Sequence, residues 1–183
     1  MTKTGKQNDI TFEKRMLESD YFWELEKILM KNHVRTSVKA VIIQNNQILL
    51  QIKRDALSQY AVLPGGGQHK GETLPEALRR ECQEEINAEV EVGDLLCVRD
   101  YISDHHEFAE ANEHVHELEL IFACSLPEGY QPQAGQAPDP GQLEVSWVPL
   151  EKLAEVHLYP QALQHYLLHL DDPSRPIYLG DMN

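Results

Sequence analysis

Apolar and polar positions alternate, or give way to short apolar runs, at six places along the chain, and each place predicts a β-strand. These segments are 34–43, 47–52, 60–63, 89–101, 115–126 and 143–148. Asn45-Asn46, a pair typical of a tight turn, separates the first two, so we expect them to form a β-hairpin. Gly93-Asp94 indicates a second turn inside the fourth segment.

Other segments repeat their apolar positions every three or four residues, which predicts helices at 11–31 and 160–170. The first of these helices packs on the core in the simplest interpretation. Contact with a second copy of the chain, in a homodimer, is the alternative. Three stretches lack such a pattern: 103–116 and the proline-rich 127–141 are expected to be loops, and 171–183 a partly extended tail.

Strands that alternate with helices fit a layered α/β fold around one core. The chain has 183 residues, of which 42% are hydrophobic, and this is enough for one globular domain. We divide the sequence into an N-terminal tail and helix, residues 1–33, and a folded domain, residues 34–183. No internal repeat or linker predicts a second domain.

Between the third and fourth predicted strands, three glycines, Gly65 to Gly67, lead through a short loop into another helix. Thr73 is expected to cap this helix, and Glu76 completes a capping box. The glycines allow backbone close to a ligand or a metal ion, because no Cβ stands in the way.

Three glutamates of this helix, Glu81, Glu84 and Glu85, share little more than a quarter of its circumference. Like charges at this spacing destabilise an isolated helix by roughly 0.2–0.5 kcal/mol per pair, so helix stability does not favour them. A solvated acidic face is the ordinary explanation for such a cluster. Hard cations such as Mg²⁺ and Mn²⁺ prefer oxygen ligands, however, and the adjacent glycines favour a metal site.

The run resembles the signature box of the Nudix hydrolases. That box reads Gly, five residues, Glu, seven residues, Arg-Glu, an aliphatic residue, any residue, Glu-Glu, any residue, Gly and an aliphatic residue. Here it extends from Gly66 to Ala88 and includes Glu72, Arg80 and the three glutamates. Asn87 stands in place of the usual late glycine. Every charged position is present, although the box covers only about an eighth of the chain.

The resemblance implies an α/β/α sandwich with a mixed sheet, to which this chain adds its N-terminal and C-terminal helices. It also implies a metal-dependent pyrophosphohydrolase, which cleaves a nucleoside diphosphate linked to another group. Glu81, Glu84 and Glu85 would then bind Mg²⁺ or Mn²⁺ and take part in catalysis, with the Gly65 carbonyl as a further ligand.

Other positions of the box have implied roles near the metal. Arg80, which we count among the catalytic residues, is expected to orient the loop and helix through an ion pair with Glu72. We assign Gly66, Gly67 and Arg54 to substrate binding. Arg54 follows Lys53 at the end of a predicted strand, where a basic pair could meet a phosphate.

The general base is left open, because Nudix hydrolases use either a glutamate of the box or a carboxylate from a later loop. Glu144 and Glu128 are our candidates for the later carboxylate. The substrate is also open among ADP-ribose-like compounds, which we favour, nucleoside triphosphates and nucleotide-linked alcohols. A Nudix-fold module that senses a nucleotide without hydrolysing it is the alternative function, and the intact charged positions favour an enzyme. Four aromatic residues are candidates for stacking on a base: Tyr60, Tyr101, Phe108 and Tyr130.

The formal net charge of -14, from 30 acidic and 16 basic residues, disfavours partners that are themselves polyanions. We therefore expect a small nucleotide as the partner, rather than nucleic acid or a membrane. A bound metal ion would reverse the sign of the charge locally. No apolar signal or membrane-length run is present, so we expect a cytoplasmic protein.

Histidine and cysteine could bind other metals. The three cysteines, Cys82, Cys97 and Cys124, are odd in number and lack CxxC spacing, which predicts reduced core residues. The stretch 103–116 is rich in His and Glu, so a second metal site can be imagined there. Its spacing is not diagnostic, and we expect a solvated loop.

Overall fold

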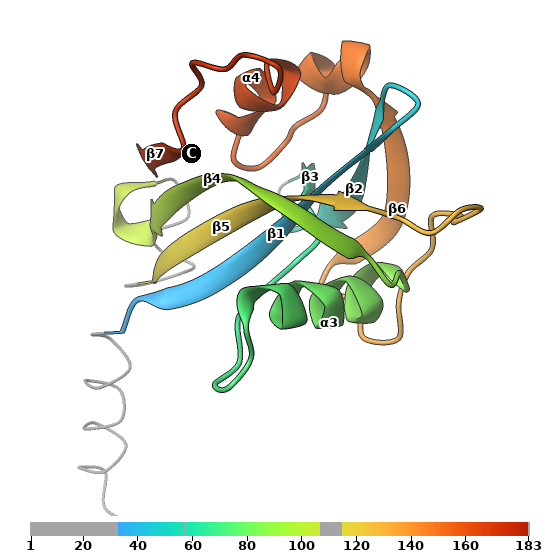
Figure 1. Cartoon of the computed structure of the whole chain (residues 1–183), viewed down its shortest axis with the longest axis horizontal. Coiled ribbons are helices and arrows are strands. Elements are labelled where there is room, and N and C mark those ends of the chain that lie inside the picture. The colour runs from blue at the N-terminus through green and yellow to red at the C-terminus, as the bar shows by residue number, and fades with distance from the viewer. Residues whose placement is uncertain (1–32, 57, 107–114, 183) are drawn as a thin grey trace, which may run out of the picture. The chain divides into compact units, whose positions relative to one another are not determined.

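Seven strands form one mixed sheet in the computed structural model of the chain, which describes residues 33–56, 58–106 and 115–182 (Figure 1). The strands are β1 (Arg35–Gln44), β2 (Gln47–Arg54), β3 (Gln59–Val62), β4 (Glu91–Ile102), β5 (His116–Ser125), β6 (Gln142–Pro149) and β7 (Tyr178–Asp181). The helical elements are α3 (Leu74–Ile86), α4 (Leu163–Leu168), η1 (Ser103–His105) and η2 (Leu150–Glu155). The predicted helix at 11–31 and Phe108 lie outside the described residues.

The strand order is β3-β2-β1-β5-β4-β7, and β6 pairs with the other edge of β2. Strands β1 and β5 are parallel, as are β4 and β7, whereas the other pairs are antiparallel. Helix α3 packs on one face of the sheet, and η2 and α4 pack on the other (Figure 1). This confirms the predicted sandwich with its mixed sheet and C-terminal helix, although α4 is shorter than the predicted 160–170.

The sheet belongs to one compact unit, Arg35–Asn183. The division of the whole chain at residue 33 stays a prediction. No helix in the described ranges combines the length and hydropathy that a bilayer span requires. The three cysteines are free, and two of them are buried.

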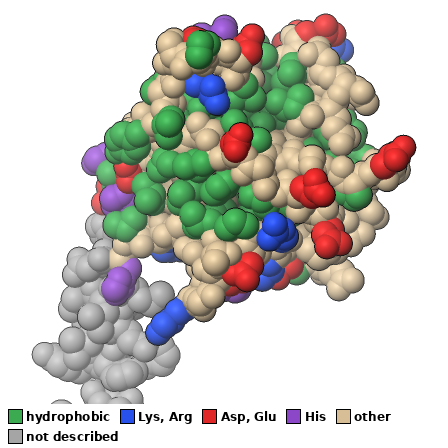
Figure 2. Space-filling view, viewed as in Figure 1, with side chains coloured by type: hydrophobic (Ala, Val, Ile, Leu, Met, Phe, Trp, Pro, Cys, Tyr) green, Lys and Arg blue, Asp and Glu red, His purple; other side chains and the backbone are tan. Residues whose placement is uncertain are grey.

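Hydrophobic side chains gather in the middle of the face seen in Figure 2, and charged side chains lie around them. Exposed apolar surface of this kind is common at contacts between proteins. The homodimer suggested above nevertheless stays a prediction.

The two predicted turns differ in outcome. Asn45 and Asn46 both adopt positive φ, 49° and 60°, and form the tight turn between β1 and β2. The turn predicted at Gly93-Asp94 was wrong, because β4 runs through both residues and its register against β5 shifts there. A Cβ on Gly93 would lie 3.2 Å from the Ala123 carbonyl oxygen, so the glycine marks an irregularity inside a strand.

The tail ends in a strand, since β7 pairs in parallel with β4 at the edge of the sheet. Two histidines of the segment predicted to be a loop hold it there. His105 Nδ1 lies 2.7 Å from Asp181 Oδ2, and His106 Nε2 lies 2.8 Å from Asp181 Oδ1. The Met182 carbonyl accepts a bond of 2.6 Å from Arg99.

Strands β1 and β2 pair only next to the turn that joins them. Nearer the start of β1, the glycine loop takes the place of β2 and bonds the free edge of the strand. The Val38 amide donates to Gly66 O at 2.9 Å, and the Ala40 amide donates to Pro64 O at 2.8 Å. Gly65 lies between these bonds with φ of +124°, and a Cβ there would approach Val38 O to 2.1 Å. No other residue fits this position without moving the backbone.

The proline-rich segment 127–141 packs on the C-terminus of α3. The helix ends at Asn87, which adopts the left-handed conformation. The segment then supplies donors to carbonyl groups that the last helical turn leaves without partners. The bonds are Tyr130 Oη to Ile86 O (2.7 Å), Gly135 N to Glu85 O (2.9 Å), Ala137 N to Glu84 O (3.0 Å) and, just beyond, Gln142 Nε2 to Glu85 O (2.9 Å).

Replacing Gly135 tests this docking, because a Cβ there would lie 2.1 Å from Glu84 O. We expect Gly135→Ala to lower the free energy of unfolding by about 1–3 kcal/mol, the usual cost of overpacking. Urea denaturation measures this. Gln136→Ala is the control, because Gln136 is exposed and adjacent. Equal stability of the two variants would contradict the packing described here.

Candidate functional site

One side of helix α3 packs on the core, and another side contacts the glycine loop. Ala77, Leu78, Cys82 and Ile86 are buried against the sheet. Thr73 caps the first turn, and Glu76 completes the capping box as predicted. The helix is therefore fixed at its start and along one side, and its acidic side lies against the loop.

Arg80 connects the loop, the helix and its glutamates. Its guanidinium makes two bonds to Glu72, at 2.7 and 3.0 Å, and a third, of 2.8 Å, to the Gly67 carbonyl. It also contacts Glu81 at 2.7 Å and Glu84 at 3.4 Å. The expected ion pair with Glu72 is thus present, and two of the three box glutamates have a positive partner.

The glycine loop leaves room for the carboxylate of Glu81. A Cβ on Gly66 would lie 2.7 Å from Glu81 Oε2. A side chain at this position would displace the Glu81 carboxylate from its place against the loop.

Glu85 is the buried member of the cluster, with only 1% of its surface exposed. Its Oε2 accepts bonds from the Gly65 amide at 2.7 Å and from Gln51 Nε2 at 2.5 Å. Oε1 is buried without a hydrogen-bond partner among the described residues. Burial raises the pKa of Glu85 above its ordinary value, and the positive charge of Lys39 opposes that shift.

Two lysines and a further carboxylate complete the surroundings of Glu85. Lys39 Nζ donates to the Gly65 carbonyl, and Lys53 Nζ forms an ion pair with Asp139 from the segment 127–141. Burial on its own would raise the pKa of Asp139. The bond and charge of Lys53, with smaller effects from Glu85 and Lys39, outweigh this and hold that pKa below its ordinary value.

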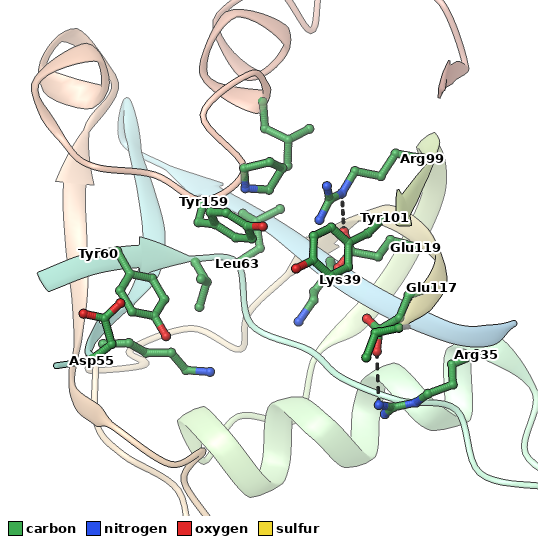
Figure 3. A pocket seen from close by; sticks show the side chains of 15 residues that line it. Arg35, Lys39, Asp55, Tyr60, Leu63, Arg99, Tyr101, Glu117, Glu119 and Tyr159 are labelled. Atoms are coloured by element: carbon green, nitrogen blue, oxygen red, sulfur yellow. Dashed lines mark hydrogen bonds and ion pairs between the residues drawn. The ribbon is translucent and has the colours of Figure 1, made fainter. Parts of the chain in front are cut away.

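A pocket of about 430 Å³ lies on the sheet face opposite α3, and both lysines line it. Figure 3 shows Lys39 reaching from β1 across this space, with Tyr60, Tyr101 and Tyr159 around it. The pocket therefore combines aromatic walls with side chains of both charges, and Lys39 and Lys53 connect it to the glycine loop and to Asp139.

A buried ion pair forms another part of the pocket wall. Arg99 donates to Glu119 at 2.5 Å, and the side chains of both residues are almost fully buried (Figure 3). The guanidinium carbon of Arg99 also lies 5.5 Å from the ring centre of Tyr101. Burying two charges is costly even when they pair, and apolar residues of similar volume would often be as stable. The stability of the fold therefore does not explain the polar wall.

The structure brings most of the predicted site residues together, but not all. The loop positions Gly65, Gly66 and Gly67 and the acidic side of α3 adjoin one another. Arg54 is exposed at the end of β2, and Glu144 is exposed on β6 opposite Ile52. Both lie outside the pocket wall, as does the exposed Glu128.

Sequence reasoning missed Lys39, Gln51 and Asp139. The first two leave a signal, because each places a polar residue inside an otherwise buried strand. Asp139 leaves none, since it is one of many polar residues in a segment rich in proline and glycine.

The donors in this region suit a hard divalent cation, since carboxylate and carbonyl oxygens are its usual ligands. The unpartnered Oε1 of Glu85 is a donor of that kind. Within the described residues, however, no three His, Cys, Asp or Glu side chains gather closely enough to enclose an ion. Magnesium is commonly held by one or two carboxylates, with water and phosphate oxygens completing its shell. The residues fit such a site better than a closed protein cage.

A mixed sheet between helices, with a glycine loop leading into an acidic helix, defines a class of α/β/α proteins. Comparison with known sequences makes the class specific: the NUDIX domain matches residues 33–169. The chain belongs to the Nudix family.

Individual relatives agree with this assignment. A nucleoside triphosphatase, NudI of Enterobacter sp. (strain 638), is 36% identical over 89 residues, which are 45% of this chain and 63% of that protein. The match thus spans less than two thirds of the relative.

Solved structures share the fold. A NUDIX hydrolase from Nitrosomonas europaea superposes with a TM-score of 0.60 at 19% identity, over 83% of this chain and 80% of that one. An ADP-ribose pyrophosphatase from Streptococcus suis 89-1591 gives a TM-score of 0.54 at 21% identity, over 82% of this chain and all of the other, 100%.

The Arg80 pair is testable by titration. Its bonds, with a smaller effect from the His69 amide, lower the pKa of Glu72 from 4.5 to about 2. The contribution of this pair to stability is therefore present above pH 4.5 and is lost as the pH falls toward 2. Carbon-13 NMR of the Glu72 carboxyl should show a midpoint well below 4.5, and Arg80→Gln should move it upward. A midpoint near 4.5 in the unmodified protein would be incompatible with the pair.

Proposed function

We propose that this protein is a metal-dependent hydrolase that cleaves the diphosphate linkage of a small nucleotide. One observation carries the proposal: two lysines that line a pocket of about 430 Å³ also contact the Gly65 carbonyl and Asp139, beside the buried Glu85. A substrate in this pocket would have its phosphates at the acidic cluster. Membership of the Nudix family supports the same reaction class.

The cation would be Mg²⁺ or Mn²⁺, with Glu81, Glu84, Glu85 and the Gly65 carbonyl as the residues that hold it. When bound, it would neutralise charge on the phosphate oxygens and lower the pKa of a bound water. Arg80 orients this set through its bonds to the loop and the helix. Gly66 and Gly67 would meet the substrate through their backbone.

Asp139 is our preferred general base. It is a carboxylate from a later loop, and Lys53 holds it ionised. A substrate phosphate that drew Lys53 away would raise the pKa of Asp139 toward the range in which a base is efficient. Glu144 stays an alternative, although it lies outside the pocket lining and its neighbour Val145 faces α3, which turns Glu144 away from the acidic cluster.

The substrate class is narrowed by the pocket and by the relatives. Tyr60, Tyr101 and Tyr159 could stack on a base, whereas Tyr130 is engaged with the end of α3. The relative NudI favours a nucleoside triphosphate, and the likeness to an ADP-ribose pyrophosphatase keeps ADP-ribose as the other candidate. The excess of acidic residues disfavours a polynucleotide. A cytoplasmic location is part of the proposal.

A substrate panel tests the function. With Mg²⁺ or Mn²⁺, the purified chain should release pyrophosphate from a nucleoside triphosphate, or monophosphates from ADP-ribose. Glu85→Gln should abolish turnover, because it removes the charge of a buried ligand, whereas Glu89→Gln, at an exposed position, should not. Tight nucleotide binding without turnover across the panel would instead support the sensor function.

A second comparison tests the general base. Asp139→Asn should lower kcat by about 10²–10⁴-fold, the usual contribution of a general base to the rate, with little change in KM. Glu151→Gln, at an exposed position on η2, is the control. If Glu144→Gln caused the larger loss, the role of base would pass to Glu144.

A further inference from the structure

The proposed reaction places Lys39 beside the acidic cluster but gives it no chemical role of its own. It comes from the middle of β1, where its neighbours Val38 and Ala40 are fully buried. Its side chain lines the pocket, and its Nζ bonds the Gly65 carbonyl. A charged side chain in an apolar strand is costly to bury unless it is paired or hydrogen-bonded, and the half-buried Lys39 is bonded to a carbonyl group rather than to a carboxylate.

The glycine loop does not need this lysine to hold its position. Backbone bonds already tie the loop to β1 on both sides of Gly65. The Gly65 amide is held separately, by Glu85. The contact of Lys39 with the Gly65 carbonyl therefore adds a positive charge to the site rather than a missing support.

Lys39 also differs from the other cations nearby. Arg80 is bound to three carboxylates, and Lys53 is paired with Asp139. Lys39 bonds a neutral carbonyl oxygen, which is also a ligand that hard divalent cations accept. Its charge lies close enough to Glu85 to oppose the rise in that pKa.

We propose that Lys39 competes with the divalent cation for the Gly65 carbonyl and the neighbourhood of Glu85, and so sets how tightly this site binds that cation. The inference rests on the proposed metal-dependent function. Two positive centres at one oxygen repel strongly at low dielectric, so binding of the cation drives the ammonium out. The flexible stem of lysine lets it turn into the pocket, where it would meet the anionic substrate.

Two variants separate charge from shape at this position. Lys39→Met keeps an unbranched side chain without charge, and Lys39→Arg keeps the charge. Lys152→Met, exposed on η2 and outside the pocket lining, removes the same charge away from Lys39 and is the control. Mn²⁺ affinity is measured by calorimetry in the absence of nucleotide. The rise in Tm from an EDTA solution to an Mn²⁺ solution is a second readout.

We expect Lys39→Met to bind Mn²⁺ about tenfold more tightly than the unmodified chain, because a repelling charge is gone. Its Tm should also rise more on addition of Mn²⁺, as mass action requires. Lys39→Arg and Lys152→Met should resemble the unmodified chain. Unchanged or weaker Mn²⁺ binding by Lys39→Met would overturn the inference, and so would equal tightening in Lys39→Arg.

The same measurements separate this inference from the function itself. If Lys39→Met and the unmodified chain bind Mn²⁺ equally and both hydrolyse nucleotides, the competition is refuted and the hydrolase stands. If neither binds Mn²⁺ at millimolar concentration, the metal site of the proposed function fails, and the competition fails with it.

Discussion

The site depends on the hydrogen bonds between the glycine loop and the part of β1 that β2 does not pair with. These bonds hold one short stretch of backbone that in turn contacts several side chains. The Gly65 amide binds Glu85, its carbonyl binds Lys39, and the Gly67 carbonyl binds Arg80. Because a Cβ on Gly65 would strike Val38, a side chain there would separate the loop from β1 and remove these contacts together. Gly65 is thus required for the path of the loop and for the contacts that the loop makes.

The second constraint acts at the other end of α3. Carbonyl groups of its last turn need donors, and the segment 127–141 supplies them. By docking there, the segment brings Asp139 beside Glu85, so the end of a helix positions a carboxylate from a distant part of the chain. A rigid helix terminus is a better support for such a residue than a free loop.

Much of the fold followed from local patterns, because alternation, turn residues and helix caps act over a few neighbours. The hairpin at Asn45 and the capping box at Thr73 are examples. The error at Gly93 arose because a glycine inside a strand and a glycine in a turn leave the same local signal. The box predicted the acidic side of α3, whereas the positions of Lys53 and Asp139 depend on how remote segments dock. No periodicity records that docking.

The three box glutamates repel one another along α3, and the protein itself supplies part of the positive charge that offsets this repulsion. Arg80 contacts Glu81 and Glu84, which reduces the repulsion along the helix. Glu85 has no such ion pair: its Oε2 accepts bonds from an amide and from Gln51, burial and the neighbouring Asp139 carboxylate raise its pKa, and its Oε1 is buried without a hydrogen-bond donor in the described part of the chain. A buried carboxylate in this position stays costly unless it is protonated or meets a cation. In the proposed metal site, Glu85 is therefore the carboxylate whose burial a cation would relieve most.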